Sequence, residues 1–195
     1  MNDKSNADKH TDLALTGMGA LAKLIGIAVP PVNALTIITE NIKDRRNRKH
    51  FNRLEKLIQC LDRRLTQVED KIPETPDLDL FDEIIAKAVS DEDEDKTEFY
   101  AALVQCWLEH KLLPYEVRLL GNAIKELTIQ EITSFCGVII TQSTYLTMPE
   151  QLKEIFWNRV EYLGLFKGGA LKYATNVTQI GQKLVEIYRL SIITK

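Results

Sequence analysis

Apolar residues recur at alternating steps of three and four along residues 51–72, which is the most regular pattern in the chain. The positions are Phe51, Leu54, Ile58, Leu61, Leu65, Val68 and Ile72. This spacing places them on one side of a helix, as in a coiled coil, and Arg64 would then pair with Glu69 of a parallel neighbour. We therefore predict that this seam is a homo-oligomer interface. The alternative is that so short a seam packs within its own chain.

A second apolar stretch, residues 13–38, precedes this helix and holds Lys23 as its single charged residue. Residues 13–29 are predicted to form a helix that Pro30 ends. Its apolar positions are Ala14, Met18, Leu21, Ile25 and Ala28. At 1.5 Å per residue this helix reaches about 25 Å, short of the roughly 30 Å hydrocarbon core of a bilayer. Two interpretations stay open: burial against the rest of the protein or an oligomer partner, and membrane activity.

Beyond a linker with two prolines at residues 73–77, apolar residues follow helical spacing in several further segments. The predicted helices are residues 78–89, 96–110, 114–127, 129–141, 151–163 and 176–190. Two Thr-x-x-Glu capping boxes, Thr128 with Glu131 and Thr147 with Glu150, precede the helices at 129–141 and 151–163. Gly164 is placed to end the second of these two helices.

Residues 165–167 and 171–173 flank a Gly168-Gly169 pair, which supplies the positive φ angles that a two-residue hairpin turn needs. Three helices followed by a hairpin outline a winged helix. We therefore predict a mainly α protein: a helical amino-terminal region with a heptad helix, then a helical bundle that ends in a winged-helix-like module with one short β-hairpin. The predicted divisions are a disordered tail at 1–12, the apolar, basic and heptad region at 13–72, a linker at 73–77, a helical pair at 78–112 and the module at 113–195.

Positive charge is concentrated between residues 43 and 53. The whole chain has a net charge of -3, which gives no general attraction to nucleic acid. Within this stretch, however, Asp44 is the single acidic residue among basic ones. The basic cluster is Lys43, Arg45, Arg46, Arg48, Lys49 and Arg53. We predict that it contacts an anionic partner or membrane surface; the alternative is a solvated helix face.

An acidic run follows the first helix of the predicted pair, at residues 90–95. A calcium loop would need glycine at Lys96 and glutamate at Ala102, so the chelating pattern is missing. We predict a solvated flank whose carboxylates meet the positive end of the next helix dipole. The alternative is a docking site for a basic partner.

The predicted wing consists of Lys167, Gly168, Gly169 and Lys172. Between residues 149 and 175 four basic residues stand against three acidic ones, a balance of +1. A net charge of +1 is small for a surface that binds phosphate groups, so nucleic acid is not the favoured partner. A winged-helix DNA-binding transcription regulator stays as an alternative function.

Candidate catalytic chemistry is sparse. Arg45 and His50 match the Arg-x4-His spacing of HEPN ribonucleases, so a HEPN-like ribonuclease is the enzymatic alternative. Cys60, Cys106 and Cys136 form no Cys-x-x-Cys pair, which favours reduced thiols over disulfides or a zinc site. We predict a non-enzymatic protein without a metal or cofactor. The polar start is no secretory signal, so we expect a cytoplasmic protein, peripheral at the inner membrane face.

The carboxyl-terminal half is similar to bacterial proteins of the abortive-infection alpha type and related phage-defence proteins. The resemblance covers residues 78–190 and lies in Phe-Tyr-Ala-Ala-Leu-Val at 99–104, Leu-Thr-Ile-Gln-Glu at 127–131, Leu-Gly-Leu-Phe at 163–166, Tyr-Ala-Thr at 173–175 and Ile-Gly-Gln-Lys-Leu-Val at 180–185. It implies a role in phage exclusion and brings no catalytic residues with it. The long charged heptad helix departs from the family pattern. We expect an oligomeric interaction protein of antiviral defence or phage-host conflict, acting through a membrane or a protein partner.

Overall fold

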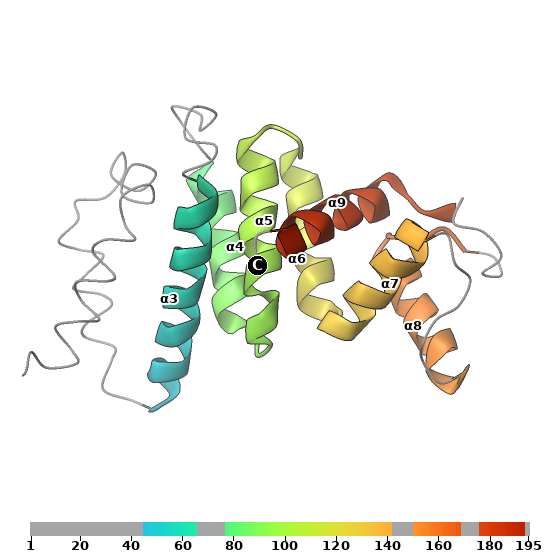
Figure 1. The fold of residues 1–195 in the computed structure, drawn as a ribbon, viewed down its shortest axis with the longest axis horizontal. Helices are drawn as coiled ribbons and strands as arrows, with labels where there is room; N and C mark the ends of the chain where they lie inside the picture. The colour runs from blue at the N-terminus through green and yellow to red at the C-terminus, as the bar shows by residue number, and fades with distance from the viewer. Residues whose placement is uncertain (1–44, 66–76, 142–149, 169–175, 194–195) are drawn as a thin grey trace, which may run out of the picture.

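The computed structural model describes residues 45–65, 77–141, 150–168 and 176–193, and these ranges are mainly helical (Figure 1). The helices are α3 (Arg45–Leu65), α4 (Leu78–Ser90), α5 (Thr97–Leu108), α6 (Pro114–Glu126), α7 (Ile129–Thr141), α8 (Glu150–Tyr162) and α9 (Gln179–Ile193). A 3-10 turn, η2 (Glu94–Lys96), joins α4 to α5. The described ranges contain no β-strand. The prediction of a mainly α protein is confirmed.

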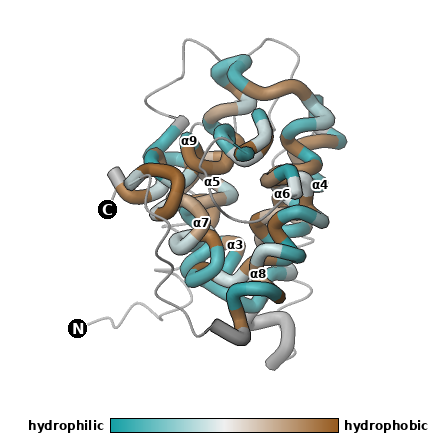
Figure 2. Tube along the Cα trace, turned by 90° about the vertical axis from the view of Figure 1, so that its right-hand side faces the viewer, coloured by the Kyte–Doolittle hydropathy of each residue, from teal (hydrophilic) through white to brown (hydrophobic). Residues whose placement is uncertain are grey.

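Helix α5 is the centre of the bundle. All of its residues from Phe99 to Leu108 are buried. A helix that is apolar on every side must be covered on every side, and α3, α4, α6 and α9 all pack against α5. Figures 1 and 2 show α5 surrounded by these helices, with hydrophobic and hydrophilic segments alternating along α4 and α6. The surrounding helices are therefore amphipathic.

Helix α3 begins at Arg45, before the predicted start at residue 51, and packs along α5 and α4. Its buried face consists of Leu57, Cys60, Leu61 and Arg64, and the half-buried Ile58 also contacts the core. Among the predicted seam residues, Leu61 is fully buried and Leu54 is half-buried. The side chains of Phe51 and Leu65, together with Val68 and Ile72, lie outside the described residues. For Ile58 and Leu61 the contacts are thus within one chain, as the alternative interpretation predicted.

Arg64 corrects one detail of the predicted coiled coil. Its side chain is 1% exposed and lies between helices of its own chain, so the proposed pair with Glu69 of a neighbour is wrong. Arg64 donates to Glu98 Oε2 at 2.9 Å and to Gln105 Oε1 at 3.1 Å, both on α5. It also donates to the carbonyl oxygen of Leu190 on α9 at 3.2 Å. One guanidinium therefore ties α3, α5 and α9 together.

The capping box at Thr128 is confirmed. The Thr128 amide donates to Glu131 Oε2 at 2.7 Å, and the Glu131 amide donates to Thr128 Oγ1 at 3.2 Å. Helix α7 begins directly after it, at Ile129. The second predicted box falls outside the described residues at Thr147.

In the described region after α8, the predicted helix stop is observed, whereas the predicted hairpin is not. Gly164 has a φ of 70°, and α8 ends two residues before it, as expected for a glycine that stops a helix. Phe166 and Val177 then form an antiparallel bridge, and the Lys167 amide donates to Asn176 at 2.9 Å. Residues 169–175, which include the predicted second strand, lie outside the described ranges. The hairpin is not confirmed.

Gly181 shows how tightly α9 packs against this bridge. A Cβ atom at this position would collide with the backbone oxygen of Leu165 and lie 2.8 Å from Val177 Cγ1. Gly181→Ala should therefore lower the free energy of unfolding by about 1–3 kcal/mol, because a well-packed site cannot admit a methyl group without backbone shifts. Gly137→Ala on α7 is the matched control, since a Cβ there would meet nothing within 4 Å. It should raise stability by about 0.5–1 kcal/mol. Urea denaturation of both variants checks the pair, and equal effects would contradict the tight packing.

Candidate functional site

Two side chains fix the first half of α3 beside the turn between α4 and α5. Arg53 Nη1 donates to the carbonyl oxygen of Val89 at 3.4 Å, and Lys56 Nζ donates to the carbonyl oxygen of Glu94 at 3.1 Å. Val89 lies in the last turn of α4, where helix carbonyl groups carry negative partial charge and attract cations. Arg53 of the predicted basic cluster is thus half-buried and engaged within the chain.

The turns of α3 before Arg53 extend past the bundle. Figure 1 shows the blue end of α3 reaching beyond the turn that joins α4 and α5. We call residues 45–52 the α3 overhang. It carries four predicted contact residues: Arg45, Arg46, Arg48 and Lys49. Their side chains, and the whole of Lys43, lie outside the described parts of the structure. The backbone nevertheless places four basic positions together at one end of an anchored helix.

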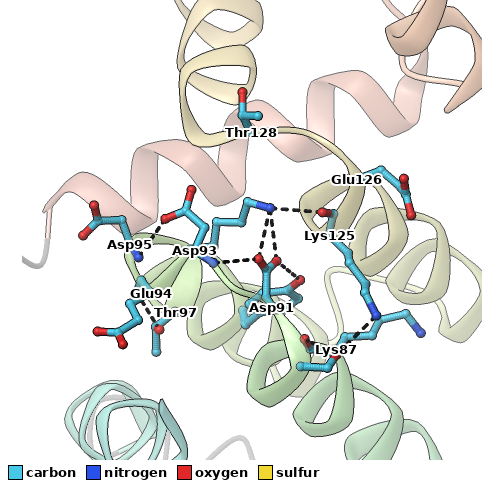
Figure 3. Close-up of polar contacts among 12 residues, drawn as sticks. Lys87, Asp91, Asp93, Glu94, Asp95, Thr97, Lys125, Glu126 and Thr128 are labelled. Carbon is cyan, nitrogen blue, oxygen red and sulfur yellow. Dashed lines mark hydrogen bonds and ion pairs between the residues drawn. The ribbon is translucent and has the colours of Figure 1, made fainter. Parts of the chain in front are cut away.

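The acidic run in the turn between α4 and α5 is organised by Asp91. This carboxylate is 7% exposed and accepts from Lys96 Nζ at 3.1 Å, from Tyr100 Oη at 2.8 Å and from the Asp93 amide at 3.1 Å (Figure 3). Lys96 Nζ, itself buried, also donates to the carbonyl oxygen of Lys125 at 3.0 Å. Burial and the bond to Asp91 raise the pKa of Tyr100 above its ordinary value, so this hydroxyl stays a donor.

The prediction of a solvated acidic flank is confirmed for three of the acids and wrong for Asp91. Glu92, Glu94 and Asp95 are exposed. Asp93 caps η2 by accepting from the Asp95 amide at 3.1 Å. Sequence reasoning missed the buried carboxylate because five adjacent acids look alike. The usable signal was the nearby pair Lys96 and Tyr100, which can both donate to one carboxylate.

The polar junction around Arg64 also includes a thiol. Glu98 accepts from Cys60 Sγ at 3.2 Å, from Arg64 and from the more exposed Arg63. Desolvation acts to raise the pKa of Glu98, but the bonds from Arg64, Cys60 and Arg63 outweigh it and lower this pKa. Burial, together with Glu98, raises the pKa of Cys60 to about 12. The thiol is therefore protonated and a poor nucleophile near neutral pH.

The other cysteines have a similar environment. Burial raises the pKa of Cys106 to about 11 and that of Cys136 above its ordinary value. All three cysteines are free thiols, as predicted, and the structure shows that all three are buried. A buried protonated thiol packs as a small apolar group rather than as a reactive one.

Helix α8 carries apolar residues on two sides. Phe156, Trp157 and Val160 are buried in the core. On the other side Leu152 is 51% exposed, Ile155 57% and Tyr162 90%. We call these three residues the α8 stripe, because steps of three and seven keep them within about 80° of one another around the helix. The stripe was not predicted, although apolar residues on both sides of the predicted helix at 151–163 were a signal for it.

Arg159 fixes the position of α8. Its guanidinium donates to Glu131 Oε1 at 2.9 Å and to the carbonyl oxygen of Glu126 at the end of α6. This basic side chain is thus paired with a carboxylate of α7, although it is 40% exposed. Glu154 and Glu161 are exposed on α8, while Lys153 is half-buried. The solvent-facing side of α8 is therefore apolar and acidic rather than basic.

Among the residues that the structure describes, the remaining predicted residues do not form one site. Lys167 and Gly168 are exposed, whereas Gly169 and Lys172 lie outside the described ranges. Arg45 and His50 share α3, but residues five apart on a helix are about 140° apart around its axis. Within the described ranges no group of three histidine, cysteine or acidic residues could hold a metal ion. None of the described helices combines the length and the apolar character needed to cross a membrane.

A scan against protein-family models and searches of curated proteins and of solved structures found no match for this chain. The resemblance to abortive-infection proteins stays a prediction.

Proposed function

We propose that the chain is a non-enzymatic interaction protein that uses the α3 overhang to contact an anionic membrane surface. The observation that carries the proposal is the placement of Arg45, Arg46, Arg48 and Lys49 on an anchored helix end that extends past the bundle. Near an anionic bilayer each basic residue contributes about 1 kcal/mol of attraction. The apolar stretch at residues 13–38 directly precedes the cluster, so charge and apolar surface would act together.

The anchoring of α3 supports this role. Lys56 and Arg53 hold the helix to carbonyl groups of Glu94 and Val89, and Leu57 and Leu61 bury its inner face. A basic helix that is already formed and fixed gives up little conformational entropy when it binds, so more of the electrostatic attraction remains as affinity. The setting we propose is phage defence at the inner membrane face. A homo-oligomer remains part of the proposal, through surfaces other than the buried Leu61.

For residues 113–195 we propose a winged-helix-like arrangement. Three consecutive helices, α6, α7 and α8, followed by the bridge between Phe166 and Val177, support it. In a DNA-reading winged helix, α8 would present basic side chains to phosphates. Its exposed apolar and acidic surface instead favours a protein contact for this module.

Replacing Arg45, Arg46 and Arg48 together by glutamate should weaken flotation of the full-length chain with anionic vesicles at least about tenfold, because three attractive charges are reversed. Glutamate near a helix amino terminus favours the helix, so α3 should stay folded. The matched control reverses the same amount of charge elsewhere, at the exposed Arg118, Lys125 and Lys167. Equal loss in both triple variants would show that only total charge matters and would contradict a role for the overhang.

A further inference from the structure

The α8 stripe is an exposed apolar surface with a regular geometry. Leu152, Ile155 and Tyr162 are each more than half exposed. With Arg159 they occupy positions i, i+3, i+7 and i+10 along α8. Arg159 donates to Glu131 and is 40% exposed, so it is the one position of this row without an apolar side chain. Clustered exposed apolar residues of this kind mark a contact surface.

A segment of the same chain repeats this spacing. Met18, Leu21, Ile25 and Ala28 also stand at i, i+3, i+7 and i+10. In a helix both rows are about 15 Å long. Two rows of equal period and length can pack side by side as ridges into grooves. Ile25 would then lie opposite Arg159, the position where the α8 row lacks an apolar side chain.

The size of the stripe favours a tethered occupant over a second copy of the chain. Stable interfaces bury about 800 Å² on each partner, more than three side chains provide. A segment joined to the same chain has an effective concentration in the millimolar range and needs less contact area. Residues 30–44 can span up to about 50 Å, which exceeds the roughly 30 Å diameter of a small domain. The tether is therefore long enough.

We infer that residues 18–28 dock on the α8 stripe of their own chain. The docked state hides the apolar segment that adjoins the basic cluster, and an anionic membrane competes for that segment. This regulation rests on the proposed function, but the docking itself does not need a membrane. Residues 18–28 are thus the segment that binds, and the α8 stripe is the surface that they bind to.

A photo-cross-linker tests the docking. A benzophenone amino acid replaces Ile155 in the full-length chain, without vesicles, and the control places it at the exposed Glu161, about 120° around the same helix. The Ile155 probe should give a product of single-chain mass whose cross-linked peptide contains residues 18–28. Met18→Asp with Leu21→Asp should lower that yield at least about tenfold, because docking would bury two carboxylates.

Three results would overturn the docking: a product of twice the chain mass, a cross-link to another part of the chain, or an unchanged yield with the two aspartates. Circular dichroism of the aspartate variant shows whether the helical bundle is kept. Membrane flotation is a separate readout. A wild-type chain that does not float with anionic vesicles but still gives the cross-link would reject the proposed function and leave the docking supported.

Discussion

Arg64→Ala should lower the free energy of unfolding by about 3–5 kcal/mol, the largest effect we expect from one substitution. The guanidinium is buried and donates to Glu98, Gln105 and the Leu190 carbonyl. Removing it leaves a partly buried carboxylate and a buried amide without their main donor, and it opens the junction of three helices. Urea denaturation followed by circular dichroism measures the loss.

Arg63→Ala is the matched control for this prediction. Arg63 contacts the same Glu98 carboxylate, but its side chain is 43% exposed, so water replaces it and the loss should stay below about 1 kcal/mol. Equal losses for Arg63 and Arg64 would contradict the assignment of Arg64 as the residue that holds the junction.

The pH dependence of stability provides a second readout for Arg64. Because the pKa of Glu98 is lowered in the folded state from its ordinary 4.5, its contribution is fully present above that value. The contribution is lost as pH falls through the lowered folded-state pKa, since the unfolded state then binds more protons. Wild-type protein should lose stability in this acidic range, and Arg64→Ala should show a smaller loss there because less of the contribution is left.

Lys96→Met should lower the free energy of unfolding by about 3 kcal/mol. Lys96 and Asp91 are 4% and 7% exposed, and breaking a buried ion pair leaves one charge without its partner. Tyr100 and the Asp93 amide still donate to Asp91, which keeps the loss at the lower end of the usual range. Chemical denaturation of the full-length chain measures this loss.

Two comparisons sharpen the test of the Asp91 cluster. Lys125→Ala removes an exposed amine that donates to Ser90 Oγ and should cost less than about 1 kcal/mol. Adding Asp91→Asn to Lys96→Met should recover part of the lost free energy of unfolding, because residue 91 then carries no unpaired charge. A double variant less stable than Lys96→Met alone would contradict the account of the cluster as a buried ion pair.

The helices of the bundle were predictable because their local signals agree. Apolar period, capping at Thr128 and the stop at Gly164 all point to the observed boundaries of α7 and α8, within one residue at each end. The apolar spacing at residues 96–110 likewise predicted a helix, which the structure shows as α5 at Thr97–Leu108. These features depend on contacts near in sequence, which a pattern can show.

The direction in which α3 faces was harder to predict. A helix drifts only about 20° per heptad from a coiled-coil seam, so a short seam cannot tell a partner chain from a neighbouring helix. The pairing of Arg64 with Glu98 and Leu190 joins residues far apart in sequence, and no local signal shows it. The burial of Asp91 and the exposure of the α8 stripe are likewise set by which helices pack together.

The most direct test of the proposed function is flotation of the wild-type chain with vesicles of phosphatidylcholine alone and of phosphatidylcholine with phosphatidylserine, each at low and high salt. Membrane contact through the α3 overhang predicts binding to the anionic vesicles at low salt, weaker binding at high salt because the charges are screened, and much less binding to the neutral vesicles. Equal binding to both vesicle types, or no binding to either, would contradict it.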